Sequence, residues 1–174
     1  MIEAFSFVLV TRAADEKSAA AAASYLKTNC AEISIVPKHG FVAVEFRGET
    51  RSLTRALVTA IRHVRAAGLK VERIEPDYLV SLSDIAVRLN VSRAAISHYR
   101  AGNRGHNFPM PVARISTNSP LWDWVDVMRW RYRTKGVTVQ HIVHAKVLRD
   151  ANRIIQRSCS DSPILTKTLL PELL

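Results

Sequence analysis

Hydrophobic and polar positions over the first 76 residues repeat with two different periods. Strand-like segments are apolar and β-branched, or alternate apolar with polar residues, and they span residues 5–10, 31–37, 41–46 and 69–74. Two other segments have the helical period, and they span residues 15–29 and 50–67. One face of the second helix is apolar and consists of Leu53, Leu57, Ile61 and Val64. Gly68 follows in the position where glycine commonly ends a helix.

These six segments follow one another as strand, helix, strand, strand, helix and strand. The turn sequence Lys38-His39-Gly40 joins the second and third strands, which predicts a hairpin. The order matches a ferredoxin-like sandwich, in which two helices cover one face of an antiparallel sheet. We therefore predict a ferredoxin-like domain over residues 1–76. Such domains bind small ligands, pair with a second copy or dock partner proteins, so the fold alone indicates no function.

Two short helical patterns meet at a tight corner within residues 82–100. In the first pattern, Ile85, Ala86 and Leu89 form one apolar face. Asn90 stands at the corner, and asparagine tolerates the left-handed backbone conformation better than most residues. The small side chain at position 86 allows the two helices to cross closely. This pattern predicts a compact pair of helices.

The outer face of the second helix is short, polar and cationic. Its first residue, Ser92, is of a type that caps helix N-termini well. The outward-facing residues are Ser92, Arg93, Ala94, Ser97, His98 and Arg100. These side chains suit base edges and phosphates in a major groove. We expect Arg93 and His98 to contact base edges, with Ser97 and Arg100 nearer the phosphates.

This corner resembles the helix-turn-helix of bacterial and phage DNA-binding regulators. That family has a small residue inside the first helix and a glycine at the turn four residues later, positions that Ala86 and Asn90 occupy here. Val91 and Ile96 match its hydrophobic positions after the turn and within the second helix. A plain packed hairpin with a solvated polar face is the alternative interpretation.

The residues that follow extend the resemblance over residues 80–133. A stretch rich in Gly, Asn and Pro at 101–111 precedes a predicted hairpin at 112–122 and a predicted helix at 123–133. This order is similar to that of winged regulators of the MerR and AlpA (excisionase) type. The matching residues are Phe108, Pro109, Pro111, Trp122, Val127 and Trp130.

The resemblance implies a winged helix-turn-helix domain, which we place at residues 77–136. It places Arg104 in the loop, and Arg114 with the Ser116–Ser119 turn in a wing that grips the DNA backbone. We interpret the tryptophans of this region as core residues rather than as stacking platforms, and these are Trp122, Trp124 and Trp130.

The last part of the chain, residues 137–174, predicts a long helix and a tail. Gly136 is expected to end the preceding helix. Apolar residues tend to one side of the pattern at 137–158, and these are Val139, Ile142, Val143, Val147, Ala151, Ile154 and Ile155. A basic outer face is predicted from Lys146, Arg149, Arg153 and Arg157. We expect the helix either to pair two copies or to pack on its own chain, and the tail at 161–174 to be disordered or to dock on a partner.

Composition adds information on partners. The formal net charge is +10. Residues 1–78 carry 11 Lys and Arg against 9 Asp and Glu, whereas residues 79–174 carry 14 against 6. The basic excess therefore lies in the half that holds the predicted helix-turn-helix, where it attracts phosphates by counterion release.

Other chemistry finds little support in the sequence. The acidic, histidine and serine residues lack catalytic spacing, so we expect no enzyme activity and no cofactor. His141 and His144 are three residues apart without a third ligand nearby, so no metal site is expected. Only two cysteines, Cys30 and Cys159, occur, and no signal peptide or membrane-spanning run is recognised. These features favour a cytoplasmic protein.

We therefore expect an α+β protein with a ferredoxin-like domain, a mostly helical winged helix-turn-helix domain and a C-terminal helix. Its expected function is sequence-specific binding of double-stranded DNA as a prokaryotic or phage transcriptional regulator. A homodimer follows from the way such regulators read paired half-sites. The alternatives are an excisionase-like protein that bends DNA, and an antitoxin-like protein whose N-terminal domain or tail binds a protein partner.

Overall fold

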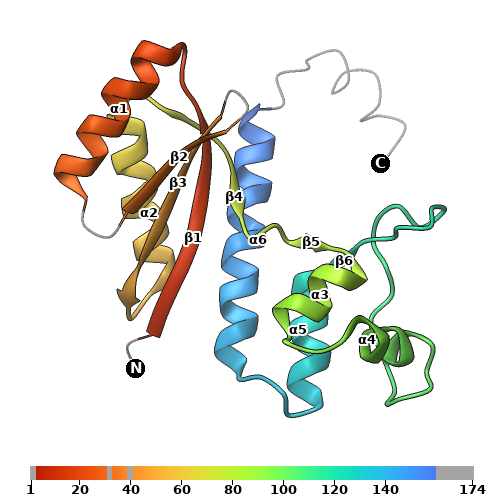
Figure 1. Cartoon of the computed structure of the whole chain (residues 1–174). Helices are drawn as coiled ribbons and strands as arrows, with labels where there is room; N and C mark the ends of the chain where they lie inside the picture. Colours follow the sequence, from red (N-terminus) through yellow and green to blue (C-terminus); the bar gives the residue numbers. More distant parts are fainter. Residues whose placement is uncertain (1–2, 31–32, 39–40, 160–174) are drawn as a thin grey trace, which may run out of the picture.

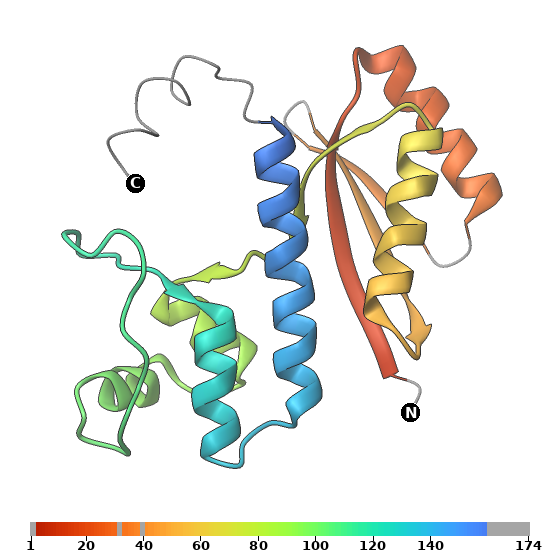
Figure 2. The ribbon, with the colours of Figure 1, turned by 180° about the vertical axis from the view of Figure 1, so that it is seen from behind.

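A four-stranded antiparallel sheet forms the first half of the chain, with strand order β2-β3-β1-β4 (Figure 1). The computed structural model describes residues 3–30, 33–38 and 41–159. The strands are β1 (Glu3–Arg12), β2 (Ile33–Lys38), β3 (Phe41–Thr50) and β4 (Lys70–Glu75). The helices between them are α1 (Glu16–Asn29) and α2 (Leu53–Ala66), and both lie in front of the sheet in Figure 2. The six predicted elements are thus present in the predicted order.

The first hydrophobic core lies between this sheet and its helices. Alternate residues of β1 and β3 face the helices, among them Phe7, Leu9 and Val44, each at most 1% exposed. Of the four residues predicted for the apolar face of α2, three are buried, and Ile61 packs at the edge of this core. The helix begins at Leu53 rather than at residue 50 because the Ser52 hydroxyl accepts the Arg55 N–H and caps it. Two residues of the predicted turn at 38–40, residues 39 and 40, lie outside the described residues.

A second hydrophobic core forms around five further elements of the chain. They are β5 (Leu79–Val80), α3 (Leu82–Arg88), α4 (Arg93–Arg100), β6 (Trp122–Asp123) and α5 (Trp124–Arg133). The largest fully buried side chains here are Trp122 and Trp130, at 1% and 2% exposure. The predicted core role of these two tryptophans is confirmed, whereas Trp124 is only half-buried.

The predicted hairpin at 112–122 is much smaller than expected. A single bridge joins Ala113 to Leu121, closed by the Leu121 N–H donating to the Ala113 carbonyl at 2.9 Å. Trp122 pairs instead with Val80, so that β6 and β5 form a separate two-stranded sheet. The apolar Trp122 takes this partner because the pairing places its ring in the second core.

The end of α5 also departs from expectation. Lys135, not Gly136, adopts the left-handed conformation that terminates the helix, with φ of +56°. The Lys135 N–H donates to the Tyr132 carbonyl, and the Gly136 N–H donates to the Arg131 carbonyl, each at 2.9 Å. These two bonds form the Schellman motif that satisfies the last carbonyls of a helix.

A long C-terminal helix, α6 (Val139–Cys159), packs on both cores. Ala145 is buried in the second core, whereas Val147, Leu148 and Ala151 pack against the first. Figure 1 shows this helix between the sheet and the helices α3, α4 and α5. Because α6 serves two cores with different faces, part of its predicted apolar side remains exposed, and these residues are Val139, Val143 and Ile154.

Asn152 joins α6 to the edge of the sheet. Its side-chain amide donates to the Ile74 carbonyl at 2.9 Å, and its carbonyl oxygen accepts the Ile74 N–H at 2.8 Å. β4 is an outer strand, so these backbone groups have no neighbouring strand to bind. Asn152 is 2% exposed, and its amide completes the hydrogen bonding of the strand edge.

A buried ion pair joins α6 to the start of α5. The Arg149 guanidinium donates to the Asp123 carboxylate at 3.1 Å, and their side chains are 13% and 8% exposed. The same carboxylate caps α5 by accepting the Val125 N–H at 2.8 Å. Burial lowers the pKa of Arg149, but the bond to Asp123 and its charge outweigh this and raise it. The prediction that Arg149 belongs to a basic outer face is therefore wrong.

Candidate nucleic-acid interface

The turn between α3 and α4 is built by local hydrogen bonds. The Asn90 N–H donates to the Val87 carbonyl at 3.1 Å, and the Val91 N–H donates to the Ala86 carbonyl at 3.0 Å. Asn90 has φ of +51°, the left-handed conformation expected from the sequence. This Schellman motif ends α3, and α4 starts three residues later, so the chain reverses direction within a few residues.

Both helices have well-formed N-terminal caps. In α3, the Ser81 hydroxyl accepts the Asp84 N–H at 3.2 Å while the Asp84 carboxylate accepts the Ser81 N–H at 2.8 Å, which is a capping box. The hydroxyl and the N–H of Ser81 also hold the pKa of Asp84 below its ordinary value. In α4, the Ser92 hydroxyl accepts the Ala95 N–H at 3.1 Å. The predicted cap is confirmed, and the Ser92 oxygen already has a partner within the helix.

The inner face of the two helices fixes their orientation. Ile85 and Ile96 are fully buried, and Ala86 is 4% exposed. Tyr99 packs edge-on against Trp130, with 5.0 Å between the ring centroids. Side chains on the inner face of α4 are thus held by the second core, which leaves the opposite face to solvent.

All six residues predicted for the outer surface of α4 are exposed, from Ser92 to Arg100. At 100° per residue, Arg93, Ser97 and Arg100 form one stripe, and Ala94 and His98 lie beside it. Among the described residues, the side chains of Arg93 and His98 have no hydrogen-bond or ion-pair partner. Their donors are therefore free to bind a partner molecule.

Two other predicted residues rest on aromatic rings of their own chain. The Arg100 guanidinium lies 5.8 Å from the centroid of Trp122, and that of Arg104 lies 5.5 Å from the centroid of Tyr99. Such stacking restricts the side chain while its N–H groups remain exposed at the ring edge. Arg100 at the end of α4 and Arg104 in the loop that follows are thus each held against an aromatic ring.

The loop after α4 is fastened to the second core by tryptophans. The Trp130 indole N–H donates to the His106 carbonyl at 3.3 Å, and that of Trp122 donates to the Pro109 carbonyl at 3.0 Å. Phe108 lies edge-on to both indole rings. These contacts hold a loop without regular secondary structure in one position, and they account for the Phe and Pro residues in this stretch.

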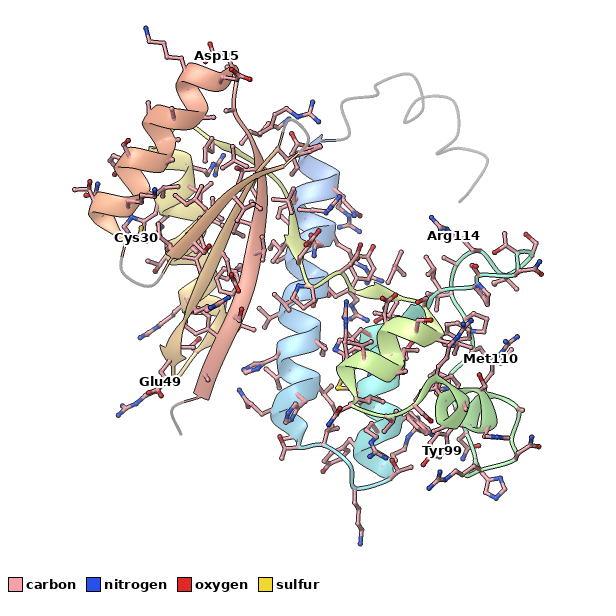
Figure 3. All side chains as sticks on the ribbon, in the orientation of Figure 1. Asp15, Cys30, Glu49, Tyr99, Met110 and Arg114 are labelled. Atoms are coloured by element: carbon pink, nitrogen blue, oxygen red, sulfur yellow. The ribbon has the colours of Figure 1, made fainter. Side chains whose placement is uncertain are left out.

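Arg114 lies on the segment that projects from the second core beyond this loop, on the same side of the molecule as α4 (Figure 3). Its backbone is left-handed, with φ of +51°. Its carbonyl accepts the N–H of Thr117 at 3.0 Å and the Thr117 hydroxyl at 2.9 Å. No other described residue pairs with the Arg114 side chain, which is exposed.

Exposed apolar side chains next to Arg114 were not anticipated from the sequence. Met110 is 80% exposed and Ile115 is 68% exposed. Figure 3 shows Met110 on the loop beside α4. The sequence signal for their exposure is an apolar residue within a stretch rich in Gly, Pro and Ser, because side chains in such loops are not expected to pack in a core. They add apolar contact area to a surface that is otherwise cationic.

The two histidines considered as metal ligands have other roles. His141 Nδ1 accepts the Thr138 N–H at 3.3 Å near the start of α6, and His144 Nε2 lies 3.2 Å from the Gln140 amide. Across the described ranges, no three His, Cys, Asp or Glu residues come together as a metal site. Likewise, no helix in the described part of the chain is both long and apolar enough to cross a membrane.

The face of α4 and its flanking arginines therefore form one exposed cationic surface. Ser92, Arg93, Ala94, Ser97, His98 and Arg100 come from α4 and its cap, Arg104 from the loop and Arg114 from the projecting segment. Comparisons of the chain with protein-family models, with curated proteins and with solved structures gave no match.

Proposed function

We propose that the chain binds double-stranded DNA sequence-specifically through α3 and α4, and that it acts as a prokaryotic or phage transcriptional regulator. In this proposal, α3 and α4 are a helix-turn-helix and α4 enters the major groove. The observation that carries the proposal is the free face of α4, on which Arg93 and His98 lack partners while the opposite face is locked in a core.

The charge around α4 supports a polyanionic partner. Residues 85–122 contain five arginines and no Asp or Glu. An acidic protein surface would also be attracted, but a short exposed helix followed by the exposed Arg104 and Arg114 suits a groove that is bordered by phosphates.

We assign the surrounding architecture in the same proposal. The segment around Arg114 is a short wing of the MerR and AlpA type, supported by the Ala113–Leu121 bridge and the anchored Phe108. The N-terminal unit is a ferredoxin-like sandwich, supported by its strand order and by two helices on one face. In this proposal the two domains end at residues 76 and 136.

Within the complex, each cationic residue has a distinct role. Arg93, near the start of α4, donates to a base edge, and a bidentate contact of arginine with guanine is the commonest specific pairing. His98 lies one turn further along, near the same groove. Arg100, Arg104 and Arg114 contact phosphates, which position the protein without reading sequence.

The experiment is a selection from a pool of random duplexes with the full chain, at about 50 and about 200 mM salt. We expect recovery of one motif at both concentrations. An inverted repeat with half-sites about 34 Å apart would show that two copies bind together. Failure to retain DNA at either salt concentration would refute the proposal, and retention without a motif would refute its sequence specificity.

A further inference from the structure

A groove with apolar walls lies between α2 and α6, and none of its lining residues belongs to the DNA-binding surface proposed above. Its volume is about 550 Å³, and its walls include Leu57, Val58 and Ile61 from α2 and Val143 and Val147 from α6. In Figure 2, α2 lies in front of the sheet and α6 runs along the β4 edge of the sheet.

The walls of this groove leave large apolar side chains uncovered. Val58 and Val143 are each 43% exposed, and Ile154, further along α6, is 65% exposed. Exposed apolar side chains scattered singly are common, whereas several in one hollow indicate a binding surface. Lys146 and Asp150 also line the groove, so it offers one charge of each sign.

The chain itself supplies a segment of matching composition. Residues 160–174 directly follow α6 and lie outside the described residues. Six of these 15 residues are leucine or isoleucine, at positions 164, 165, 169, 170, 173 and 174. The segment also carries Lys167 and Glu172, whose charges are opposite to those of Asp150 and Lys146.

The segment is long enough to reach the groove from the end of α6. The groove follows α6 from Val143 to Ile155, a rise of about 18 Å, and Ile155 lies about 6 Å before the end of the helix. Fifteen extended residues span about 50 Å. The segment can therefore turn at the end of α6 and run back along the whole groove.

We propose that residues 160–174 fold back along α6 and place their apolar side chains in the groove of the same chain. The occupant is the segment of the same chain rather than that of a second copy because the attachment to α6 gives it a high effective concentration at the groove. This proposal is independent of DNA binding, since none of the residues involved belongs to the cationic surface.

Trypsin cleavage after Lys167 provides the test in the full chain. Lys167 is the only Lys or Arg in residues 160–174, so release of the fragment 168–174, followed by mass spectrometry, reports on access to the segment. Val143→Glu and Val58→Glu should each release it at least about tenfold faster, because cleavage follows the population of the undocked state. Val87→Glu is the matched control, since Val87 is an 80% exposed valine of α3 outside the groove, and it should leave the rate unchanged.

A second measurement covers the case in which a groove variant perturbs the fold. The full chain with Leu169→Glu and Leu170→Glu leaves the groove walls intact and should bind a hydrophobic dye more strongly than the native chain. Adding Val143→Glu should remove that increase. Equal release rates in the native chain and both groove variants, together with unchanged dye binding, would overturn the proposal.

The dependence of the release rate on protein concentration shows whether the docked segment belongs to the same chain or to a second copy. Docking within one chain gives a release rate that does not change with chain concentration. Protection that increases with concentration, together with a doubled mass in solution, would show that two copies exchange their segments and would overturn the assignment to the same chain.

Discussion

Replacing Asn152 with alanine should destabilise the protein far more than a typical substitution of asparagine. The side chain is 2% exposed and binds both the N–H and the C=O of Ile74, at 2.8 and 2.9 Å. In the variant, both backbone groups stay buried without a partner. Each such group costs about 1–3 kcal/mol, so the free energy of unfolding should fall by about 2–6 kcal/mol.

Asn29→Ala is the matched control for this change. Asn29 is exposed at the end of α1, and its amide donates to the Tyr25 carbonyl at 2.8 Å within the same helix. Water can replace that bond, so the free energy of unfolding should change by less than about 0.5 kcal/mol.

Urea denaturation of both variants, followed by far-ultraviolet circular dichroism, measures the two effects. Linear extrapolation of each transition gives the free energy of unfolding in water. If Asn152→Ala lowered this free energy no more than Asn29→Ala does, the argument that the Asn152 amide completes the edge of β4 would be refuted.

Three further predictions each concern a single residue. Lys135→Gly should raise the free energy of unfolding by about 1 kcal/mol because glycine adopts the left-handed conformation without strain, while Lys135→Ala should leave it nearly unchanged in urea denaturation. Arg149→Ala leaves the buried Asp123 carboxylate without its ion-pair partner and should lower the free energy of unfolding by about 3 kcal/mol. The Arg153 guanidinium lies 3.8 Å from the same carboxylate and its side chain is 50% exposed, so Arg153→Ala should lower that free energy by less than about 1 kcal/mol. Hydrogen bonds to Ser81 lower the folded-state pKa of Asp84. The stabilisation by Asp84 is therefore complete above the ordinary carboxyl pKa of about 3.9 and is lost as the pH falls through the lower folded-state pKa. Thermal melts of Asp84→Asn should show less acid destabilisation than the native chain, and equal acid dependence would contradict this.

Local structure could be predicted from the sequence because its signals are local. The apolar period of α2, the cap at Ser92 and the turn at Asn90 each depend on residues within one or two helical turns. The helices and the four strands of the first sheet accordingly occur in the predicted order, with ends shifted by a few residues. The exposed face of α4 follows from the same periodicity, because the buried Ile96 and the partly buried Tyr99 face the core and leave the other side to solvent.

Long-range partners could not be predicted in the same way. Nothing near Asn152 or Arg149 in the sequence shows that Ile74 and Asp123 bind them, because 78 and 26 residues separate the partners. The regular spacing of basic residues along α6 therefore predicts a solvated face. For the same reason, the pairing of Val80 with Trp122 replaced most of the predicted hairpin.

The position of α6 explains why its apolar pattern was difficult to interpret. A helix that packs on one core has a single apolar stripe, whereas α6 contacts two cores and also borders a groove. Its apolar residues consequently spread around the helix, and Val143 and Ile154 are exposed even though they belong to the predicted stripe.

The most direct test of DNA recognition is the affinity of Arg93→Ala for a selected duplex and for its single-base variants. Arg62→Ala, which removes an exposed arginine of α2, is the matched control, and it should change the binding free energy by less than about 0.5 kcal/mol. Arg93→Ala should lose about 1–3 kcal/mol on the selected site and relax the preference at one base pair. Full affinity and unchanged preference in Arg93→Ala, or equal losses in both variants, would contradict the placement of α4 in the major groove.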